Sequence, residues 1–238
     1  MKIDILTLFP EVFDFLSNYG VIGKAVESGK LEIRLTNIRN FSHDKHWKVD
    51  DTVFGGAAGM LMMPGPIVEA IESLQENKEE LEDRGHVIYL SPQGPVLTQE
   101  KAISLSKQEH LILLCGHYEG IDSRVSQHFI DEEISIGDYV LTGGEIPAMV
   151  LVDTVVRWID GVLGNEASAP TDSLADGLIQ YDEYTKPRDF RGFQVPEVLL
   201  NGNHKAIAEW RRQSSLENTR RKRPDLYKKY LEKDQRNK

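Results

Sequence analysis

The sequence is poor in cysteine and has no long apolar segment. Cys115 is the single cysteine among 238 residues, which excludes an intramolecular disulfide framework and fits a reducing compartment. We expect its thiol to be buried and inert, because no neighbouring residue supplies an activating charge. No run approaches the roughly 20 apolar residues of a membrane span, and the N-terminal MKIDILTLFP is typical of a first strand rather than a signal peptide. These absences predict a cytoplasmic protein with no membrane partner.

Two glycine motifs that bind phosphate groups are also missing. Neither G-x-G-x-x-G nor G-x-x-x-x-G-K-S/T occurs in the chain, which disfavours ordinary dinucleotide and triphosphate sites. Glycines instead punctuate three apolar segments, Tyr89–Gly94, Leu111–Gly120 and Ser135–Ala148. Because glycine lets backbone approach a ligand closely, three such strand ends predict one pocket for an uncharged, adenosine-sized ligand. A purely structural turn is the alternative for each segment taken alone.

Charge is distributed unevenly along the chain. The formal net charge is -10, yet residues 186–238 carry 15 Lys or Arg and 7 Asp or Glu, a local charge of +8. Because phosphate binding depends on Lys and Arg, this tail is interpreted as a basic, nucleic-acid-binding module on an acidic body. A solvated helical face is the alternative. The candidate RNA-binding residues are Lys186, Arg188, Arg211, Arg212 and Arg220.

Apolar patterning predicts alternating strands and helices. With 40% hydrophobic residues the chain can bury a full core, and the alternation predicts an α/β fold with a mainly parallel sheet covered on both faces. A glycine-rich stretch, Asp50–Met63, predicts a loop whose backbone packs closely against another segment. The predicted strands are Lys2–Phe9, Leu31–Ile38, His86–Leu90, His110–Cys115 and Glu132–Ile136. The predicted helices are Pro66–Leu74, Thr98–Ser106, Ile121–Ile130, Glu145–Ile159, Asn203–Thr219 and Pro224–Leu231.

Composition divides the chain into three parts. Residues 1–160 hold the alternating elements and predict one large domain. Residues 161–185 are small, polar and acidic, with little apolar periodicity, which predicts a mobile linker. Residues 186–238 predict a small α-helical domain that carries the basic charge.

Several sequence blocks, in this order and spacing, resemble the bacterial tRNA (guanine-N1)-methyltransferases of the SPOUT superfamily. The resemblance extends from Met1 to about Arg223 and rests on KIDILTLFPEVF, DDTVFGGAAGM, YLSPQG, LLCGHYEGIDSRV, ISIGDYVLTGGEIPA, DSLADGL and RGFQVPEVLLNGNHKAIAEWRR. The glycine-rich loop departs from the family's usual PYGGGAGM at Val53, Phe54 and Ala57. The resemblance implies transfer of a methyl group from S-adenosylmethionine to the guanosine at position 37 of tRNA, beside the anticodon.

The same resemblance implies an unusual architecture. It implies a SPOUT-type sheet with a deep trefoil knot, in which residues 111–147 thread through an earlier loop and form the cofactor pocket. It also implies an obligate homodimer, in which the linker and tail of one subunit complete the pocket of the other. The apolar helix Ile146–Ile159 is a candidate dimer face, although a buried core helix fits its pattern equally well. Mg²⁺ is implied to assist the reaction, but the histidine spacing shows no metal ligands and the metal site is unknown.

Methylation of guanine N1 requires removal of the N1 proton and stabilisation of charge on O6. Asp172, in the predicted linker, is the candidate general base; since an ordinary aspartate is too weak a base for N1, it needs a raised pKa or a stabilised O6. Its alternative role is the N-cap of a helix over residues 173–178. Arg157, near the end of the long helix, is by resemblance the partner of O6, and a surface salt bridge is its alternative.

The three glycine-punctuated segments supply the candidate cofactor-binding residues. We expect Gly116 and Ile136–Leu141 to cradle the adenosyl group, with Tyr89–Gln93 as the opposite wall. Glu119 is a candidate for orienting the methionine amino group or a divalent ion, and a structural turn residue is its alternative. The full set is Tyr89, Leu90, Ser91, Pro92, Gln93, Gly94, Gly116, Tyr118, Glu119, Gly120, Ile136, Gly137, Asp138, Tyr139, Val140, Leu141, Gly143, Gly144 and Pro147.

Two other functions stay open at this point. A nonenzymatic RNA-binding module would carry the basic tail without a cofactor pocket. A related SPOUT enzyme would methylate another target, such as a ribose 2′-hydroxyl or a pseudouridine, and would not need Asp172 as a base.

Overall fold

The chain forms two compact units, Met1–Gly164 and Asn165–Lys238, called here the N-terminal and C-terminal units. A computed structural model describes residues 1–75, 84–164 and 172–236. None of the helices in these ranges is long and apolar enough to cross a membrane.

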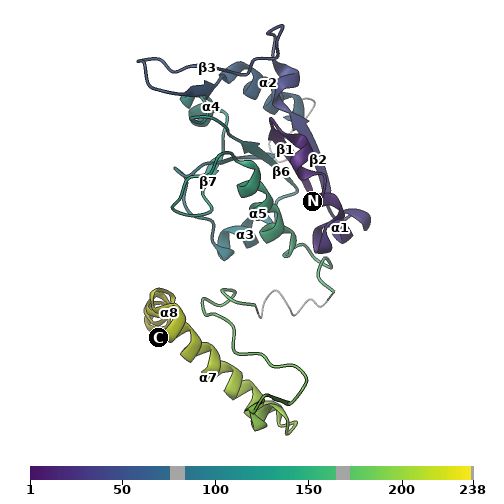
Figure 1. The fold of residues 1–238 in the computed structure, drawn as a ribbon, viewed down its shortest axis with the longest axis vertical. Coiled ribbons are helices and arrows are strands. Elements are labelled where there is room, and N and C mark those ends of the chain that lie inside the picture. Colours follow the sequence, from purple (N-terminus) through teal and green to yellow (C-terminus); the bar gives the residue numbers. More distant parts are fainter. Residues whose placement is uncertain (76–83, 165–171, 237–238) are drawn as a thin grey trace. The chain divides into compact units, whose positions relative to one another are not determined.

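A five-stranded sheet forms the centre of the N-terminal unit (Figure 1). The strand order is β2-β1-β6-β5-β7, and every neighbouring pair is parallel. All five predicted strands and their parallel arrangement are therefore confirmed. Their bounds are β1 (Lys2–Thr7), β2 (Glu32–Asn37), β5 (His86–Leu90), β6 (His110–Cys115) and β7 (Glu132–Ile134).

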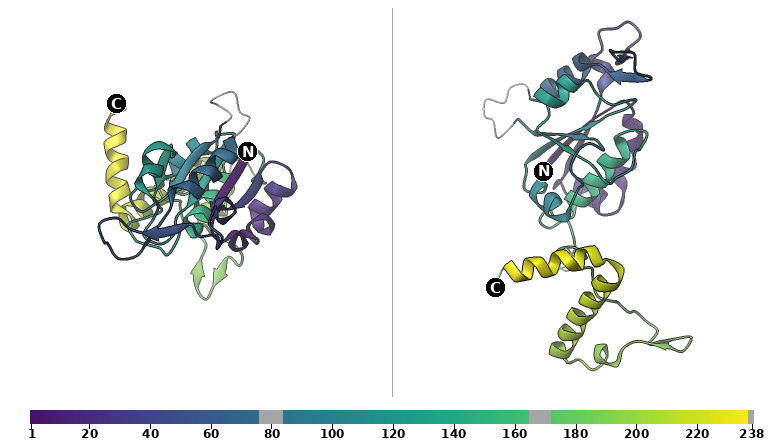
Figure 2. Two further views of the ribbon diagram at one scale, coloured as in Figure 1. Left: turned by 90° about the horizontal axis from the view of Figure 1, so that it is seen from above. Right: turned by 90° about the vertical axis from the view of Figure 1, so that its left-hand side faces the viewer.

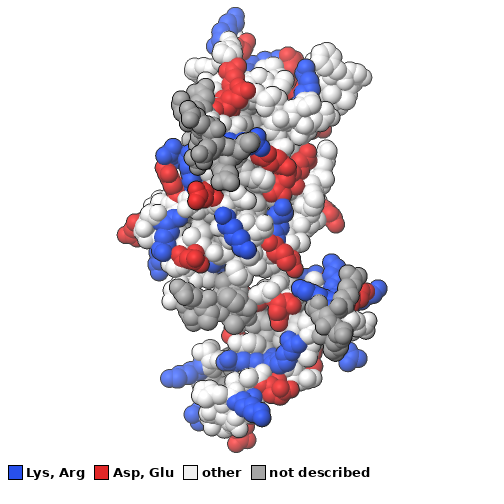
Figure 3. All heavy atoms as spheres, turned by 180° about the vertical axis from the view of Figure 1, so that it is seen from behind, with Lys and Arg blue, Asp and Glu red and all other residues white. Residues whose placement is uncertain are grey.

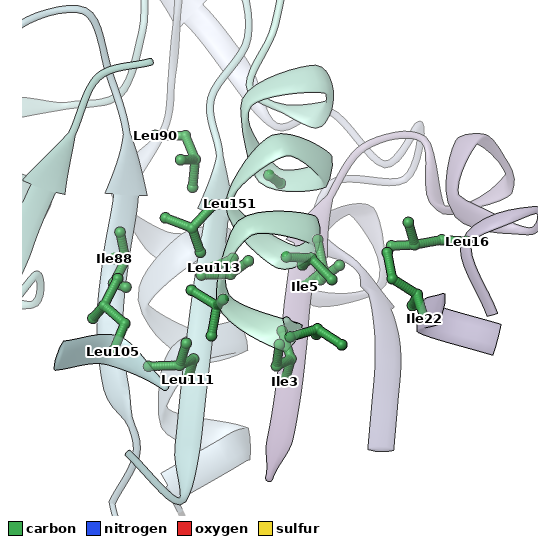
Figure 4. Packing of buried hydrophobic residues seen from close by; sticks show 14 of the residues in the cluster. Ile3, Ile5, Leu16, Ile22, Ile88, Leu90, Leu105, Leu111, Leu113 and Leu151 are labelled. Atoms are coloured by element: carbon green, nitrogen blue, oxygen red, sulfur yellow. The ribbon is translucent and has the colours of Figure 1, made fainter. Parts of the chain in front are cut away.

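Helices cover both faces of the sheet, as predicted. One face packs against α1 (Gly20–Glu27), α3 (Gln99–Leu105) and α5 (Glu145–Val156), and the other against α2 (Pro64–Gln75) and α4 (Ser123–His128). Successive strand residues point to opposite faces, so Leu111 and Leu113 join the first layer while Ile112 and Leu114 join the second. Figure 4 shows Leu151 of α5 with Leu90 and Leu113 of the sheet. Short 3₁₀ helices occupy Pro10–Phe13, Leu16–Asn18 and Ile38–Phe41.

Capping residues set several helix ends. Thr98 is the N-cap of α3, because its hydroxyl accepts a hydrogen bond from the Lys101 amide. The helix α4 begins two residues later than predicted, since the Asp122 side chain accepts from the Arg124 amide and acts as the N-cap. The helix α5 ends at Val156 with Arg157 as its C-cap, three residues before the predicted end.

The stretch predicted as a single loop, Asp50–Met63, contains a small hairpin. Its antiparallel strands are β3 (Asp50–Thr52) and β4 (Met60–Met62). The prediction of a loop throughout was therefore wrong, because strands of three residues carry no readable alternation. Close backbone packing is confirmed at Gly59, where a Cβ atom would lie 2.5 Å from Cγ of Glu119.

The C-terminal unit contains α7 (His204–Lys222) and α8 (Pro224–Arg236), which meet at Pro224. A 3₁₀ turn, Glu197–Leu199, and a two-residue hairpin, β8 (Asp189–Phe190) with β9 (Phe193–Gln194), precede them. Figure 2 shows this hairpin projecting away from both helices. Both tail helices were predicted, and each is longer than its predicted range.

Part of the predicted linker is hydrogen-bonded to α7. The Ile179 amide donates to Oγ1 of Thr219 at 3.0 Å, and the Asp182 amide donates to Oγ of Ser214 at 3.0 Å. Residues 179–182 therefore differ from the mobile linker that composition indicates, because hydroxyl groups of α7 bind the backbone of Ile179 and Asp182. Residues 165–171 of the predicted linker lie outside the described residues.

Candidate active site

A cavity lies at the carboxyl ends of β5, β6 and β7, three adjacent strands of the sheet. Each strand runs directly into a loop of the wall, beginning at Ser91, Gly116 and Ser135. The structure brings together all predicted cofactor residues except Gly94 and Asp138. The predicted residues in the wall are Tyr89, Leu90, Ser91, Pro92, Gln93, Gly116, Tyr118, Glu119, Gly120, Ile136, Gly137, Tyr139, Val140, Leu141, Gly143, Gly144 and Pro147.

The wall also differs from the predicted set. Gly94 and Asp138 are not part of it, and His117, Ile134, Ser135 and Thr142 are. Gly94 has a packing reason instead, since a Cβ there would lie 2.5 Å from the Glu133 carbonyl carbon. His117, Ser135 and Thr142 lie in the strand-end loops, and Ile134 is the last residue of β7. Including the last strand residue and every residue of each following loop would have found them.

Two glycines bring the cavity loops into backbone contact. A Cβ on Gly144 would lie 2.6 Å from Cα of Cys115, and one on Gly116 would lie 2.8 Å from the Tyr89 ring. The Gly144 amide donates to the Gly116 carbonyl at 2.9 Å. Because backbone atoms cannot move aside as a flexible side chain can, Gly144 must be glycine for this wall to form.

Two ionisable groups near the floor stay uncharged. Burial, with the nearby Glu133 carboxylate, raises the pKa of Tyr89 to about 12, so its hydroxyl remains protonated at neutral pH. Burial also raises the pKa of the Cys115 thiol, with Glu145 adding to the effect. Cys115 is fully buried, which confirms the predicted buried thiol.

A hydrogen-bonded network supports the loop after β6. Glu145, 7% exposed, accepts a hydrogen bond from the Thr7 hydroxyl at 2.8 Å and lies 3.3 Å from Nε2 of His117. The His117 ring packs against Phe9 with 5.0 Å between ring centroids. This network joins the start of α5 to the loop that carries Glu119.

The loop around Glu119 is tied to the β3–β4 hairpin. The Glu119 amide donates to the Met60 carbonyl, and the Met62 amide donates to the Gly120 carbonyl, both at 3.0 Å. Tyr118 adopts a φ of 58°, a left-handed conformation that non-glycine residues rarely adopt and that is often found at functional sites. Within the described residues, no group of three His, Cys, Asp or Glu is arranged to hold a metal ion, so a preformed Mg²⁺ site is not evident there.

The two candidate catalytic residues lie in different units. Arg157, in the N-terminal unit, is exposed at the C-cap of α5, where its charge interacts favourably with the helix dipole. Asp172, in the C-terminal unit, lines a cavity with Asp176, Tyr181 and Arg211. Residues 172–178 form a turn in which the Ala175 amide donates to the Asp172 carbonyl at 3.3 Å. The alternative role of Asp172 as a helix N-cap was therefore wrong.

The candidate RNA-binding residues are all exposed in the C-terminal unit, and two of them have partners within it. The Arg211 guanidinium lies 4.9 Å from the centre of the Tyr181 ring, and Arg212 lies 3.7 Å from an Asp176 carboxylate oxygen and contacts the Tyr230 hydroxyl. Figure 3 shows Lys and Arg side chains across the visible face of this unit, with fewer Asp and Glu between them.

An all-parallel sheet with a cavity at the carboxyl ends of adjacent strands is the arrangement of the α/β proteins whose ligand sites lie at their strand ends. The comparisons with known proteins narrow this class. The family model for tRNA (Guanine-1)-methyltransferase TrmD matches residues 1–229, and the chain belongs to this family. The family resemblance of the sequence blocks is thereby confirmed.

Curated relatives match almost the whole chain. The tRNA (guanine-N(1)-)-methyltransferase of Finegoldia magna is 55% identical over 97% of this chain and 97% of the relative. The protein of the same name from Ruminiclostridium cellulolyticum is 56% identical over 96% of this chain and 97% of the relative. That from Staphylococcus aureus strain MRSA252 is 48% identical over 97% of this chain and 92% of the relative.

Proposed function

We propose that this chain transfers the methyl group of S-adenosylmethionine to N1 of the guanosine at position 37 of tRNA, and that it works in the cytoplasm. The observation that carries the proposal is the cavity at the carboxyl ends of β5, β6 and β7. Family membership adds the reaction, because the curated relatives are named tRNA (guanine-N(1)-)-methyltransferases.

The chemistry of the cavity walls fits S-adenosylmethionine. A nucleoside needs apolar surface for its ring faces and hydrogen-bonding groups at its edges. Val140 and Leu141 offer apolar side chains that are 83% and 39% exposed, and the glycine-bearing loops offer backbone amides and carbonyls. Glu119 is one of the lining residues, and its negative charge complements the cationic methionine end. When bound, S-adenosylmethionine supplies an electrophilic methyl group on a positively charged sulfur.

We assign the chemistry at the guanine to Asp172 and Arg157. The Asp172 carboxylate accepts the N1 proton, and the N1 electron pair forms the new bond to the methyl carbon as the carbon–sulfur bond breaks. The Arg157 guanidinium donates a hydrogen bond to O6, where negative charge develops. Because this charge is stabilised, N1 becomes easier to deprotonate.

Contacts between the cavity loops support the proposed trefoil knot. The Ser135 amide donates to the Pro95 carbonyl at 3.0 Å, and the Ser135 carbonyl accepts from the Leu97 amide at 2.7 Å. The same segment reaches the loop after β6 through the bond from Gly144 to Gly116. The segment after β7 thus contacts the loops after β5 and β6, as a segment threaded through an earlier loop must. An experimental structure tests the knot directly. If the traced backbone proves topologically unknotted, the proposed knot is contradicted.

An exposed stripe on α5 supports the proposed homodimer. Ile146 and Val150 are 56% and 39% exposed, and Arg157 follows on the same helix face, since 4 and 11 residues are close to whole helical turns. We propose that this stripe contacts a second copy and brings Arg157 to a site shared between subunits. Sedimentation should show a dimer for the native chain and monomers for Ile146→Glu; monomers for both would contradict the dimer.

A methyl-mapping assay tests the proposed function. The chain is incubated with labelled S-adenosylmethionine and tRNA transcripts that carry guanosine or adenosine at position 37. Label should appear only in the guanosine transcript, at N1. Equal labelling of both transcripts would contradict the proposal, and label on a ribose would assign a different SPOUT reaction. Absence of both labelling and cofactor binding would favour a nonenzymatic RNA-binding module.

A further inference from the structure

The β8–β9 hairpin carries an aromatic face that the C-terminal unit does not cover. Phe190 pairs directly with Phe193 across the hairpin, and residues paired in this way project from the same face of a β-ribbon. Their side chains are 60% and 79% exposed. Large apolar groups left in water at neighbouring positions mark interaction sites rather than core.

The hairpin holds these two rings in a defined place despite its short strands. Arg191 and Gly192 form its turn with φ values of 58° and 86°, the left-handed pair of a type I′ turn. The Asp189 carboxylate accepts a hydrogen bond from the Gly192 amide at 2.9 Å. A further bond from the Val195 amide to the Arg188 carbonyl, at 2.9 Å, extends the ladder.

Positive charge surrounds the aromatic face. The Arg191 guanidinium lies 5.4 Å from the centre of the Phe190 ring, and Lys186 and Arg188 are exposed just before the hairpin. Asp189 is the single acidic residue among residues 186–194. Aromatic rings with arginine beside them form the stacking platforms by which proteins hold unpaired nucleotides, because every base has a π-face and every nucleotide a phosphate.

We propose that Phe190 and Phe193, with Arg191, stack against unpaired bases of the tRNA. The inference rests on the proposed function and deepens it, since it adds a second kind of contact to the phosphate-binding residues of the tail. A protein–protein contact is the competing occupant. The charge favours RNA, because the cations Lys186, Arg188 and Arg191 beside the rings outnumber the single acidic residue there and complement a polyanion.

A double variant, Phe190→Leu with Phe193→Leu, separates the two occupants. Leucine keeps an apolar side chain that a protein interface can accept, but it lacks the ring on which a base stacks. Because each stacked base contributes roughly 5- to 150-fold to affinity, we expect the dissociation constant for tRNA to rise at least about tenfold. The Michaelis constant for S-adenosylmethionine and the thermal unfolding curve should not change. Tyrosine at both positions should restore native tRNA affinity.

Two controls make the result specific. Phe15→Leu removes a ring of the N-terminal unit that is 52% exposed, and it should leave tRNA affinity unchanged. Arg191→Gln should lower the slope of log affinity against log salt by about one, as expected for a lost phosphate contact.

The platform is overturned if the leucine pair binds tRNA as the native chain does. It is also overturned if Phe193→Glu converts dimers to monomers while each monomer keeps native tRNA affinity, since the hairpin is then a subunit contact. Fluorescence anisotropy measures RNA binding without catalysis. If the native chain binds tRNA through the hairpin but transfers no methyl group, the proposed function is contradicted. The proposed stacking of Phe190 and Phe193 on tRNA bases is then still supported.

Discussion

The N-terminal unit buries the side chains of a sheet and five helices, whereas among the described residues of the C-terminal unit Leu178 is the one buried apolar side chain. The C-terminal unit instead buries Ser214, Asn218 and Thr219, whose side chains bond the segment that follows Asp172. A hydrogen-bonded unit with little apolar core opens at lower free energy than a packed one. We therefore expect the unit that holds the strand-end cavity to be the more stable one, and the unit that holds the proposed base to open more easily.

The largest expected effect is the loss of methyl transfer when the proposed base in the C-terminal unit is replaced. Asp172→Asn should lower single-turnover methyl transfer by about 10²- to 10⁴-fold, the usual contribution of a general base, while the affinity for S-adenosylmethionine stays native. Asp176→Asn is the matched control, since Asp176 lines the same cavity, and it should retain most activity. Full transfer by the Asp172 variant would refute the assigned base.

The next effect tests how the C-terminal unit is held together. Thr219→Val removes a fully buried hydroxyl that accepts from the Ile179 amide and donates to the Ser215 carbonyl. Leaving the amide unpaired should cost about 1–3 kcal/mol of stability, measured by denaturant unfolding. Thr154→Val, whose hydroxyl bonds Val150 within α5, should change stability by less than about 0.5 kcal/mol. Equal losses of stability in the two variants would show that the Thr219 hydroxyl does not stabilise the C-terminal unit through the Ile179 amide.

The third effect concerns the cavity of the N-terminal unit. Gly144→Ala forces a Cβ against the backbone of Cys115, and the required shift should cost about 1–3 kcal/mol. Because the shift moves two cavity loops, affinity for S-adenosylmethionine should fall by about tenfold or more in a calorimetric titration. Gly65→Ala meets no atom within 4 Å and should bind the cofactor normally. Native affinity in the Gly144 variant would mean that the loops adapt freely.

The smallest effect is a pH dependence that belongs to the N-terminal unit. Asp4 is fully buried, and while burial alone raises its pKa, hydrogen bonds from His110 and Lys2 outweigh burial and hold the pKa below its usual value. A lowered folded pKa stabilises the fold at any pH above the unfolded value near 4, and this contribution is lost as pH falls through the folded pKa.

Acid titration of Asp4→Asn checks this dependence. The variant should be less stable than the native chain at pH 7 and should lose less stability than the native chain between about pH 5 and pH 2. Parallel stability curves for the two proteins would contradict the linkage.

The same difference between the units explains what the sequence could predict. Strands such as His110–Cys115 are buried apolar runs that end at glycine, so their limits are visible in the residues. Packing of Ile179 and Asp182 on α7 depends on single hydroxyl groups, and no periodic pattern marks which serine or threonine is buried. Polar composition therefore indicated a linker where the chain is in fact bonded to a helix.

The cavity was largely predictable because neighbouring parallel strands end at one edge of the sheet. Each strand-end loop therefore contributes consecutive residues to the wall. The exception with a packing cause is Gly94, which is required by the approach of Glu133. Contacts of this kind depend on tertiary structure and leave no local signal.

The central claim is that Arg157 of one subunit and Asp172 of another act on one guanosine. Mixing separately inactive Arg157→Ala and Asp172→Ala chains tests it most directly, after the subunits are allowed to exchange. If the site is shared, half of the dimers are mixed and one of their two sites is native, so methyl transfer should recover to about a quarter of the native rate. Mixtures that exchange subunits but stay as inactive as the separate variants would show that each site is built within one chain.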